Sequence, residues 1–485
     1  MPFSTDGYRW TPEEGLKTGV PTDAVIVPQS LNIDADTVYD AIVVGAGYAG
    51  LRATRDLSLQ GHKVLILEGR DRIGGRTCSV KADGYVYEAG GTWVHRNQAL
   101  VWSEIVRYGF ENRLKDSQEF YEGSRCPTAI RNDAVHEVPW TDQTSATGFA
   151  KFCNIDGQMG NSVFGLHQPA DWLRHEDFIK WDSMSCQDRL DQIKEDLSAE
   201  EIEGIIHLLL ALSKGPLTRP SYGEVLRWVA LSGGNLASMG EHTARWKLAD
   251  GQTALALAMF DDALKTGNLA YSFSSNVSSV TTEGHITTVT TTAGQSFKTS
   301  SVVVAAPLNC LADIQFSPAL DQTKAEAIAQ GHTNHAYKVC VEAKGKQWRN
   351  WMGNAYPHKG VPFLNGDGIN PSGNSYLIST PGNYIDPQNE MDKLLEGLQY
   401  LHPELEVLRI FGMDYHSHPL SKGGWAVHGP GYVTKYLESL QAPAGNVYFA
   451  SADWADVWRG FIDGALESGA KAAWSAHKQL RNASS

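Results

Sequence analysis

The chain has 485 residues, of which 42% are hydrophobic and 20% are charged. This balance is typical of globular proteins and excludes a wholly disordered or fibrous chain. The length suggests roughly two to four domains, or one large interleaved fold. The formal net charge of −14 at pH 7 disfavours binding to a phosphate backbone, so we expect no nucleic-acid partner.

No segment has the pattern of a membrane span or a secretory signal. The richest apolar run, Ile205–Leu212, is far shorter than the about 20 residues that a bilayer requires. The first residues contain no apolar signal core, and Asn482–Ser485 matches neither a peroxisomal address nor a membrane tail. The six cysteines are thinly spread, with no CxxC pair and no Cys/His cluster. We therefore expect a reduced, cytoplasmic protein that contacts no membrane and holds no metal.

The N-terminal part predicts an arm followed by a β-α-β unit. Residues 1–37 carry four prolines and little periodicity, which predicts an extended surface arm. The apolar run and glycines of Tyr39–Gly50 predict a buried parallel strand and a tight turn. Ala53 and Leu57 follow at helical spacing, and Lys63–Arg72 has the apolar pattern of a second buried strand.

Several further segments of the chain have patterns that predict secondary structure. Ser198–Glu201 fits a capping box at the start of an apolar helix that should end near Gly215. Residues 268–307 are rich in Ser, Thr and Val, with short alternating runs that predict a β-meander. A strand over Asn446–Asp453 and an alanine-rich helix over Ile462–Leu480 are expected near the C-terminus.

Gly45-Ala-Gly47-Tyr-Ala-Gly50 is a GxGxxG motif between the first predicted strand and helix. Gly45 allows a tight turn, Gly47 lets the backbone approach a pyrophosphate at the helix N-terminus, and Gly50 lets the helix pack on the strand. Glu68 ends the second strand, where a carboxylate binds ribose hydroxyls and repels a 2′-phosphate. The pattern indicates a dinucleotide site; the alternative is a glycine-rich turn in a domain that binds nothing.

A second motif, Arg70-Asp-Arg-Ile-Gly74-Gly75-Arg76-Thr77, directly follows. Adjacent glycines let the backbone pass close to a second part of the cofactor, and arginines supply fixed donors for pyrophosphate or flavin oxygens. A nicotinamide enzyme needs no such contact, so the motif favours a flavin. The alternative is a charged surface turn.

With both motifs, VVGAGYAGL…ILEGRDRIGGRT resembles the FAD-dependent amine oxidase family. Glu88–His95 resembles the family's stretch beside the isoalloxazine, Val302–Pro307 its mid-chain strand, Phe449–Asp453 its FAGxE segment, and Trp458–Ala465 its last flavin-contacting turn. Taken together, the motif sequences are most similar to those of soluble fungal monoamine oxidases.

The resemblance implies an α/β fold with two domains and a short tail. A discontinuous Rossmann-like FAD-binding domain and an α+β substrate-binding domain would follow the arm. The expected ranges are 38–112, 248–325 and 420–480 for the first, 113–247 and 326–419 for the second, and 481–485 for the tail.

The resemblance also implies which residues bind FAD. They lie in the glycine motifs, the flavin-facing stretches, the meander and the C-terminal turn: Gly45, Gly47, Tyr48, Ala49, Gly50, Glu68, Gly69, Arg70, Gly74, Gly75, Arg76, Gly90, Gly91, Thr92, Trp93, Val277, Asp453, Trp458, Phe461, Ile462 and Ala465. Asp453 replaces the family's usual glutamate. Some relatives link FAD to a cysteine where this chain has Gly424, so we expect non-covalent FAD.

Three residues match the family's catalytic positions. Trp425 and Phe461 match two aromatic rings that form a slot in front of the flavin, where ring faces attract a cationic amine and favour its neutral form. The alternative is that both are ordinary core aromatics. Lys338 matches the lysine that holds a water at flavin N5 and assists the reaction with oxygen. Because Lys338, Cys340 and Glu342 alternate along one strand, a solvated strand face is the alternative.

These matches imply a flavin monoamine oxidase, an amine:oxygen oxidoreductase. It would transfer hydride from a primary or secondary amine to FAD N5 and yield an imine or aldehyde and hydrogen peroxide. An L-amino-acid oxidase, a polyamine oxidase and a desaturase of secondary metabolism stay open on the same fold, as does a scaffold with structural FAD. The expected partners are a small amine and oxygen, and a homodimer is left open.

Overall fold

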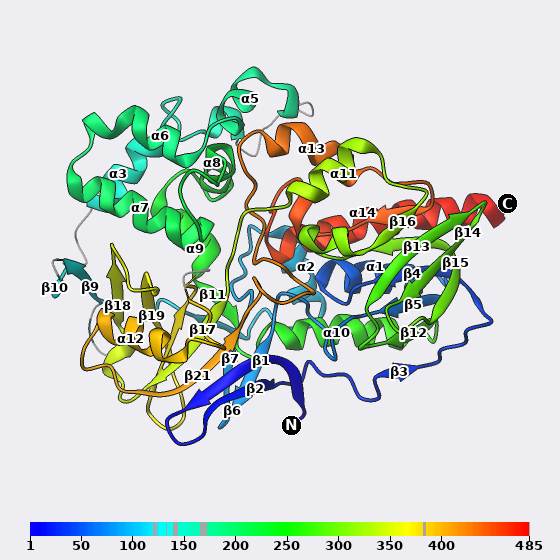
Figure 1. Ribbon diagram of the computed structural model, residues 1–485, viewed down its shortest axis with the longest axis horizontal. Coiled ribbons are helices and arrows are strands. Elements are labelled where there is room, and N and C mark those ends of the chain that lie inside the picture. The colour runs from blue at the N-terminus through cyan, green and yellow to red at the C-terminus, as the bar shows by residue number, and fades with distance from the viewer. Residues whose placement is uncertain are drawn as a thin grey trace.

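The computed structural model describes residues 1–119, 123, 125–131, 133–138, 144–164, 172–381 and 385–484. Within these residues, two nine-stranded sheets organise the molecule. One sheet and its helices fill the right half of Figure 1 and include the C-terminus; the other sheet and a group of helices fill the left half. The architecture is the expected α/β type with two large units, while the domain boundaries themselves stay a prediction.

The first sheet is built around the predicted β-α-β unit, which is confirmed. β4 (Val38–Val44) and β5 (Val64–Leu67) pair in parallel, and α1 (Tyr48–Leu59) connects them. In spatial order the sheet contains β16 (Gln315–Ser317), β13 (Val277–Glu283), β14 (Ile286–Thr291), β15 (Ser296–Val304), β4, β5, β12 (Leu269–Ser272) and β3 (Ser30–Leu31), and β22 (Val447–Phe449) pairs with β15. The predicted meander corresponds to β13, β14 and β15, whose pairings are antiparallel.

Helices cover both faces of this sheet, which is why β4 is apolar and buried from Ala41 to Val44. Ala41 and Val43 belong to one hydrophobic core, and Ile42 and Val44 belong to the other, because successive strand residues point to opposite faces. The helices on the two sides are α1, α2 (Ala99–Arg107), α10 (Gln252–Leu264), α14 (Ile462–Ser484), α11 (Gln322–Gln330) and α13 (Tyr432–Gln441).

The second sheet lies in the lower left of Figure 1. Its strands, in spatial order, are β10 (Ala134–Glu137), β9 (Cys126–Arg131), β18 (Trp351–Ala355), β19 (Phe363–Ile369), β20 (Ser375–Ser379), β17 (Lys338–Ala343), β21 (Val407–Met413), β1 (Phe3–Thr11) and β2 (Gly15–Pro21). α12 (Met391–Leu401) packs on it through Leu394, Leu398 and Leu401. Two short pairs, β6 (Ser79–Ala82) with β7 (Tyr85–Glu88) and β8 (Leu114–Asp116) with β11 (Trp246–Leu248), complete the strands of the described chain.

The N-terminal segment is a hairpin, and the extended arm predicted for residues 1–37 is wrong over its first part. β1 pairs with β2 and with β21, so the hairpin is part of the second sheet. Ser4, Asp6 and Tyr8 alternate along β1 and are buried. Two of these three inward residues are polar, so the strand lacks the apolar alternation by which strands are recognised in a sequence.

A group of helices forms the upper left of Figure 1. It contains α3 (Thr144–Cys153), α4 (Asn161–Phe164), α5 (Glu176–Asp182), α6 (Cys186–Ile193), α7 (Ala199–Ser213), α8 (Tyr222–Leu231) and α9 (Leu236–Ala244). The predicted capping box is confirmed, since Ser198 and Glu201 bond each other's backbone N–H groups at the start of α7. α7 ends at Lys214, which has the left-handed φ of 56°.

The C-terminal helix α14 continues beyond its expected end. It includes residues 481–484, which were predicted as a tail, and Ser485 lies outside the described residues. Among the described helices, none is long and apolar enough to cross a membrane.

Candidate active site

A cavity of about 760 Å³ lies where the two halves of the molecule meet, near the upper end of the usual range for small-molecule sites. Most of the predicted site residues line it: Gly45, Gly47, Tyr48, Ala49, Glu68, Gly69, Arg70, Gly74, Gly75, Arg76, Gly90, Gly91, Thr92, Trp93, Val277, Lys338, Trp425, Phe461, Ile462 and Ala465. Gly50, Asp453 and Trp458 do not line it. The cavity thus unites segments that lie up to 420 positions apart, from Gly45 to Ala465.

The two glycine motifs approach each other closely. A Cβ atom on Gly75 would lie 3.1 Å from the Cα atom of Gly47, and Gly75 itself has a φ of +59°. A Cβ atom on Gly50 would lie 1.8 Å from the carbonyl oxygen of Gly45. Gly47 has only Gly75 within 4 Å of its Cβ direction, so the backbone at Gly47 remains accessible to a ligand. A side chain at Gly50 or Gly75 would collide with the neighbouring glycine turn, whereas a side chain at Gly47 would occupy part of the cavity that Gly47 lines.

The first turn of α1 opens onto the same space. Tyr48 and Ala49 line the cavity, and the N-cap residue Gly47 provides no side chain to bond the first N–H groups of the helix. Such a helix N-terminus attracts anions. Beside it, the Glu68 carboxylate accepts hydrogen bonds from the backbone N–H groups of Ala46 (2.6 Å) and Arg70 (2.8 Å), which fixes both loops around the acid expected to meet the ribose.

The arginines of the second motif bond protein groups. Arg76 Nη1 donates to the Gly424 carbonyl at 2.7 Å, and Arg76 Nη2 lies 2.8 Å from Asp453 Oδ1. Burial alone would raise the pKa of Asp453, but Arg76, His332 and the hydrogen bond from the Leu308 N–H together more than offset this, and the pKa is lowered. Arg70 is likewise paired, with Asp6 at 2.8 Å. The two predicted cofactor arginines therefore line the cavity while also bracing the loops around it.

Lys338 begins β17 and is buried, as are Cys340 and Glu342, so the solvated strand face is wrong. Its ammonium nitrogen donates to the Gly90 carbonyl (3.0 Å) and to Thr92 Oγ1, and it lies 4.9 Å from the ring centroid of Trp93. Burial lowers the pKa of Lys338. The lysine thus contacts the stretch Gly90–Trp93, which the resemblance places beside the isoalloxazine.

Trp425 and Phe461 line one cavity from neighbouring chain segments. A Cβ atom on Gly460, the residue before Phe461, would lie 3.6 Å from Trp425 Cβ. The Trp425 indole N–H donates to the Leu212 carbonyl at 3.0 Å, which connects the ring to the end of α7. Phe461 packs edge-on against Trp458, with the ring centroids 5.2 Å apart at an angle of 76°. Both rings are therefore held in place by contacts outside the slot.

Trp228 is a cavity residue that the sequence did not reveal. It lies on α8, lines the cavity, and contacts Phe461 edge-on with the ring centroids 5.9 Å apart. Its sequence context, an apolar helix, is that of any core tryptophan, so no local signal could have distinguished it.

The three predicted residues that do not line the cavity support those that do. Asp453 is buried and also accepts from the Leu308 N–H at 2.8 Å. Trp458 holds Phe461, and Gly50 allows α1 to pack against the first glycine turn.

At Gly424, a Cβ atom would lie 2.7 Å from Ala336 Cβ and 2.8 Å from Asn334 Oδ1. A cysteine at this position would require its neighbours to move.

Comparisons with known proteins show the family of the chain. Residues 48–477 match the family model described as flavin containing amine oxidoreductase. The chain is 32% identical over 465 residues to the pseudooxynicotine dehydrogenase of Pseudomonas sp., covering 94% of this chain and 89% of that protein. It is 26% identical to the (S)-6-hydroxynicotine oxidase of Paenarthrobacter nicotinovorans, covering 89% and 97%.

The fold is also that of solved amine oxidases. The cyclohexylamine oxidase of Brevibacterium oxydans superposes with a TM-score of 0.73 at 22% identity, covering 92% of this chain and 100% of that one. These relatives are bacterial, and the expected closeness to fungal monoamine oxidases stays a prediction. The close approach of Gly47 and Gly75, the N-terminus of α1 and the carboxylate of Glu68 fit a bound dinucleotide. The chain therefore belongs to the flavin-containing amine oxidoreductase family, and its cofactor is FAD.

Proposed function

We propose that the protein is a flavin monoamine oxidase. It oxidises a primary or secondary amine at the carbon beside the nitrogen, the resulting imine hydrolyses to an aldehyde, and oxygen is reduced to hydrogen peroxide. The observation that carries the proposal is the placement of Trp425 and Phe461 on the same cavity as both glycine motifs. When bound, FAD supplies the oxidant for this two-electron reaction.

The chain's own side chains prepare the amine and the cofactor. Trp425 and Phe461 present ring faces that attract an ammonium group, and their apolar surroundings favour loss of its proton. Lys338 donates hydrogen bonds along the edge where the flavin is expected and can hold a water there. Its burial away from bulk solvent strengthens each of these interactions.

The carboxylates of the cavity favour a monoamine over a diamine. Among its described lining residues, the acids are Glu68, Asp313 and Asp367. Glu68 bonds backbone N–H groups, Asp313 Oδ1 lies 2.6 Å from Lys422 Nζ, and Asp367 pairs with the buried Lys247. A second ammonium group on the substrate would find each of these acids already engaged.

Anaerobic titration of the yellow protein tests the proposal. Primary and secondary aryl and alkyl monoamines should bleach the flavin, whereas a matched diamine of equal chain length and an L-amino acid should do so at least about tenfold more slowly. Admission of oxygen should then restore the colour with one equivalent of peroxide. If no monoamine reduces the flavin, the proposal fails; if the amino acid is the best reductant, the half-buried Arg125 on the cavity wall becomes the partner of its carboxylate.

A second candidate is an amine dehydrogenase, which passes electrons to an acceptor other than oxygen. One relative is named a dehydrogenase and another an oxidase, so the electron acceptor needs its own measurement. Mixing substrate-reduced protein with oxygen or with an artificial one-electron acceptor decides between them. Fast reoxidation by oxygen supports the oxidase, and fast reoxidation by the artificial acceptor alone supports the dehydrogenase.

We also propose that FAD is bound non-covalently. Gly424 replaces the cysteine that would form the link, and the contacts of Gly424 leave no room for a side chain. Acid precipitation should therefore release the yellow colour into the supernatant, and colour that stays with the pellet would contradict this proposal.

A further inference from the structure

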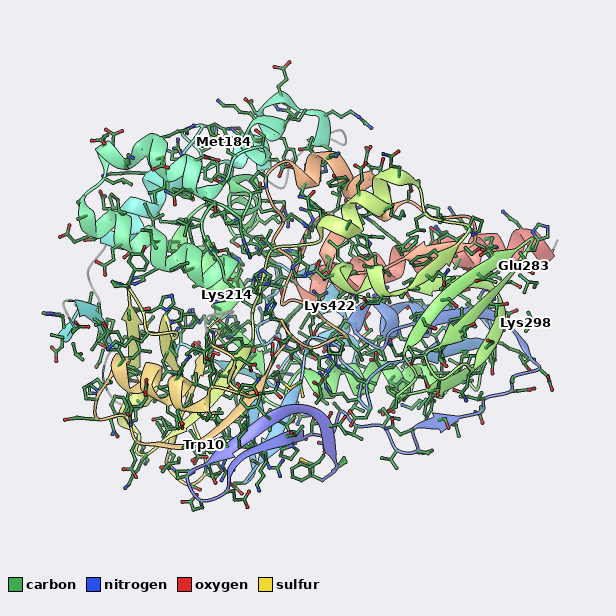
Figure 2. All side chains as sticks on the ribbon, in the orientation of Figure 1. Trp10, Met184, Lys214, Glu283, Lys298 and Lys422 are labelled. Atoms are coloured by element: carbon green, nitrogen blue, oxygen red, sulfur yellow. The ribbon has the colours of Figure 1, made fainter. Side chains whose placement is uncertain are left out.

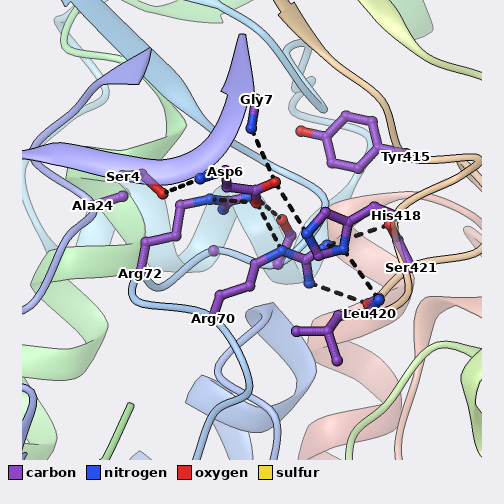
Figure 3. A network of polar contacts seen from close by, with 12 residues as sticks. Ser4, Asp6, Gly7, Ala24, Arg70, Arg72, Tyr415, His418, Leu420 and Ser421 are labelled. Atoms are coloured by element: carbon purple, nitrogen blue, oxygen red, sulfur yellow. Dashed lines mark hydrogen bonds and ion pairs between the residues drawn. The ribbon is translucent and has the colours of Figure 1, made fainter. Parts of the chain in front are cut away.

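We propose that Asp6 of the N-terminal hairpin is a positioning residue of the FAD site. Its carboxylate lies in a buried network with the second glycine motif (Figure 3). Arg70 Nε lies 2.8 Å from Asp6 Oδ2, and Arg72 Nη2 lies 2.6 Å from the same oxygen. All three side chains are at least nine-tenths buried. The hairpin thereby fixes the loop that carries Gly74, Gly75 and Arg76.

The network reaches the segment before Trp425 through Arg70. Arg70 Nη1 donates to the Leu420 carbonyl at 3.1 Å, and Arg70 Nη2 donates to Ser421 Oγ at 3.3 Å and contacts His418 Nδ1 at 3.1 Å. Leu420 and Arg70 both line the cavity. Figure 3 shows Asp6 between the two arginines on one side and His418 on the other. One carboxylate therefore connects the cofactor loop with the segment that leads to the aromatic slot.

Arg72 shows how completely this network fixes the loop. Its guanidinium also donates to the carbonyl groups of Ile73 (3.1 Å), Gly75 (3.0 Å) and Thr77 (3.0 Å). It has no exposed surface and does not line the cavity, so it orders the loop without contacting the cofactor. Asp6 supplies the charge that makes two buried arginines tolerable, since breaking a buried ion pair leaves uncompensated charge.

The charge of this network allows an experiment to distinguish a positioning role of Asp6 from a purely electrostatic effect on FAD binding. Burial alone would raise the pKa of Asp6, but Arg72 and Arg70 hold it well below its usual range, so the carboxylate is ionised. Burial and Arg70 lower the pKa of His418 to about 4, so this ring is neutral at pH 7. Replacing Asp6 by Asn removes one negative charge and therefore makes the surroundings of the diphosphate site more positive. Electrostatics alone would strengthen FAD binding, whereas loss of positioning weakens it.

The coupling between docking of the hairpin and binding of FAD must act in both directions. If the docked hairpin favours the loop geometry that binds FAD, FAD must favour the docked hairpin by the same factor. The hairpin belongs to the second sheet and the loop follows a strand of the first, so Asp6 joins the two halves of the molecule at the cofactor. This inference depends on FAD binding and not on the choice of amine.

The test compares three full-length variants by FAD affinity. Asp6→Asn should weaken FAD binding at least about tenfold, within the usual size of such couplings, and Asp6→Glu should restore part of it because the charge is kept. Asp23→Asn is the matched control: it makes the same charge change in the same N-terminal segment, at a partly exposed pair with Lys81, and should change the affinity by less than about twofold. Unchanged or tighter FAD binding by Asp6→Asn overturns the proposal.

A measurement on the wild-type protein covers the case in which Asp6→Asn does not fold. Amide hydrogen exchange of residues 3–21 is compared with and without FAD. Exchange across the hairpin should slow when FAD is added, by the factor that the affinity coupling requires. Equal exchange rates in the two states would show that the hairpin and the cofactor are independent, and the proposal would be wrong.

Discussion

Lys214 has a buried amine with no ion pair among the described residues, and its replacement should stabilise the protein. The residue ends α7 and has no exposed surface. Among the described residues, its ammonium nitrogen has no hydrogen-bond partner. Its nearest favourable groups are rings, with centroids 4.8 Å away in Phe363 and 5.6 Å away in Trp425. Figure 2 shows Lys214 near the middle of the molecule, away from the periphery where Lys298 lies.

The expected gain follows from the cost of keeping this amine buried. Burial lowers the pKa of Lys214 well below its ordinary value. Removing the proton of an ordinary lysine at pH 7 costs about 4.6 kcal/mol, which is an upper limit to the penalty. An unpaired buried polar group costs at least about 1 kcal/mol, and ring contacts offset part of the charge penalty. Lys214→Met removes the amine, keeps most of the length of the side chain and should therefore stabilise the fold by about 1–4 kcal/mol.

The stability difference between Lys214→Met and the wild type should depend on pH, which gives the most specific test of this prediction. The folded-state pKa is lowered, so the unfolded chain binds the proton more tightly. The penalty is then fully present at low pH and is lost as the pH rises toward about 10.4. The advantage of Lys214→Met should thus shrink between pH 7 and pH 9.5, measured by urea unfolding with FAD in equal excess.

Lys298→Met is the control for this comparison, because Lys298 is exposed on β15. It should change stability by no more than about 0.5 kcal/mol at either pH. The reasoning is refuted if Lys214→Met is less stable than the wild type, or if its advantage is the same at both pH values.

Three further substitutions probe the site. Gly50→Ala places a Cβ atom 1.8 Å from a backbone oxygen, which should cost roughly 1–3 kcal/mol and leave purified protein with less than half the FAD of Gly215→Ala, whose Cβ atom meets nothing closer than 3.7 Å and whose backbone is not left-handed; equal FAD contents would argue against close packing at Gly50. Lys338→Met should slow reoxidation of the reduced protein by oxygen more than it weakens FAD binding, and comparable oxygen rates in a stopped-flow experiment would count against the role of Lys338. Gly424→Cys should form no covalent flavin and should lose stability because of its crowded neighbours; colour retained in an acid pellet would refute this.

Local patterns in the sequence were sufficient for the β-α-β unit and the meander of the first sheet. β4, the glycine turn and α1 follow from one apolar run and the spacing of Gly45, Gly47 and Gly50, because the turn, the strand and the helix impose their requirements on adjacent residues. The capping box at Ser198 was predictable for the same reason. Each of these features is specified within about a dozen positions.

Features that depend on distant contacts were not predictable from the sequence. Asp6 bonds Arg70 across 64 positions, and neither residue has a pattern that identifies its partner. The hairpin was missed because two of the three buried residues of its first strand are polar. Trp228 was missed because an aromatic residue in an apolar helix looks the same in a core and at a cavity. Resemblance to a family predicted Trp425 and Phe461 as a pair, where composition and spacing alone favoured ordinary core residues.

The distribution of the cavity wall along the chain also constrains how the protein is made. Gly45 contributes near the start of synthesis, while Trp425, Phe461 and Ala465 contribute only near its end. A ribosome that has translated nine-tenths of the message has therefore produced both glycine motifs but neither Phe461 nor Ala465. We therefore expect stable FAD binding only after residue 465 has been translated, so a nascent chain arrested before residue 425 should not retain flavin.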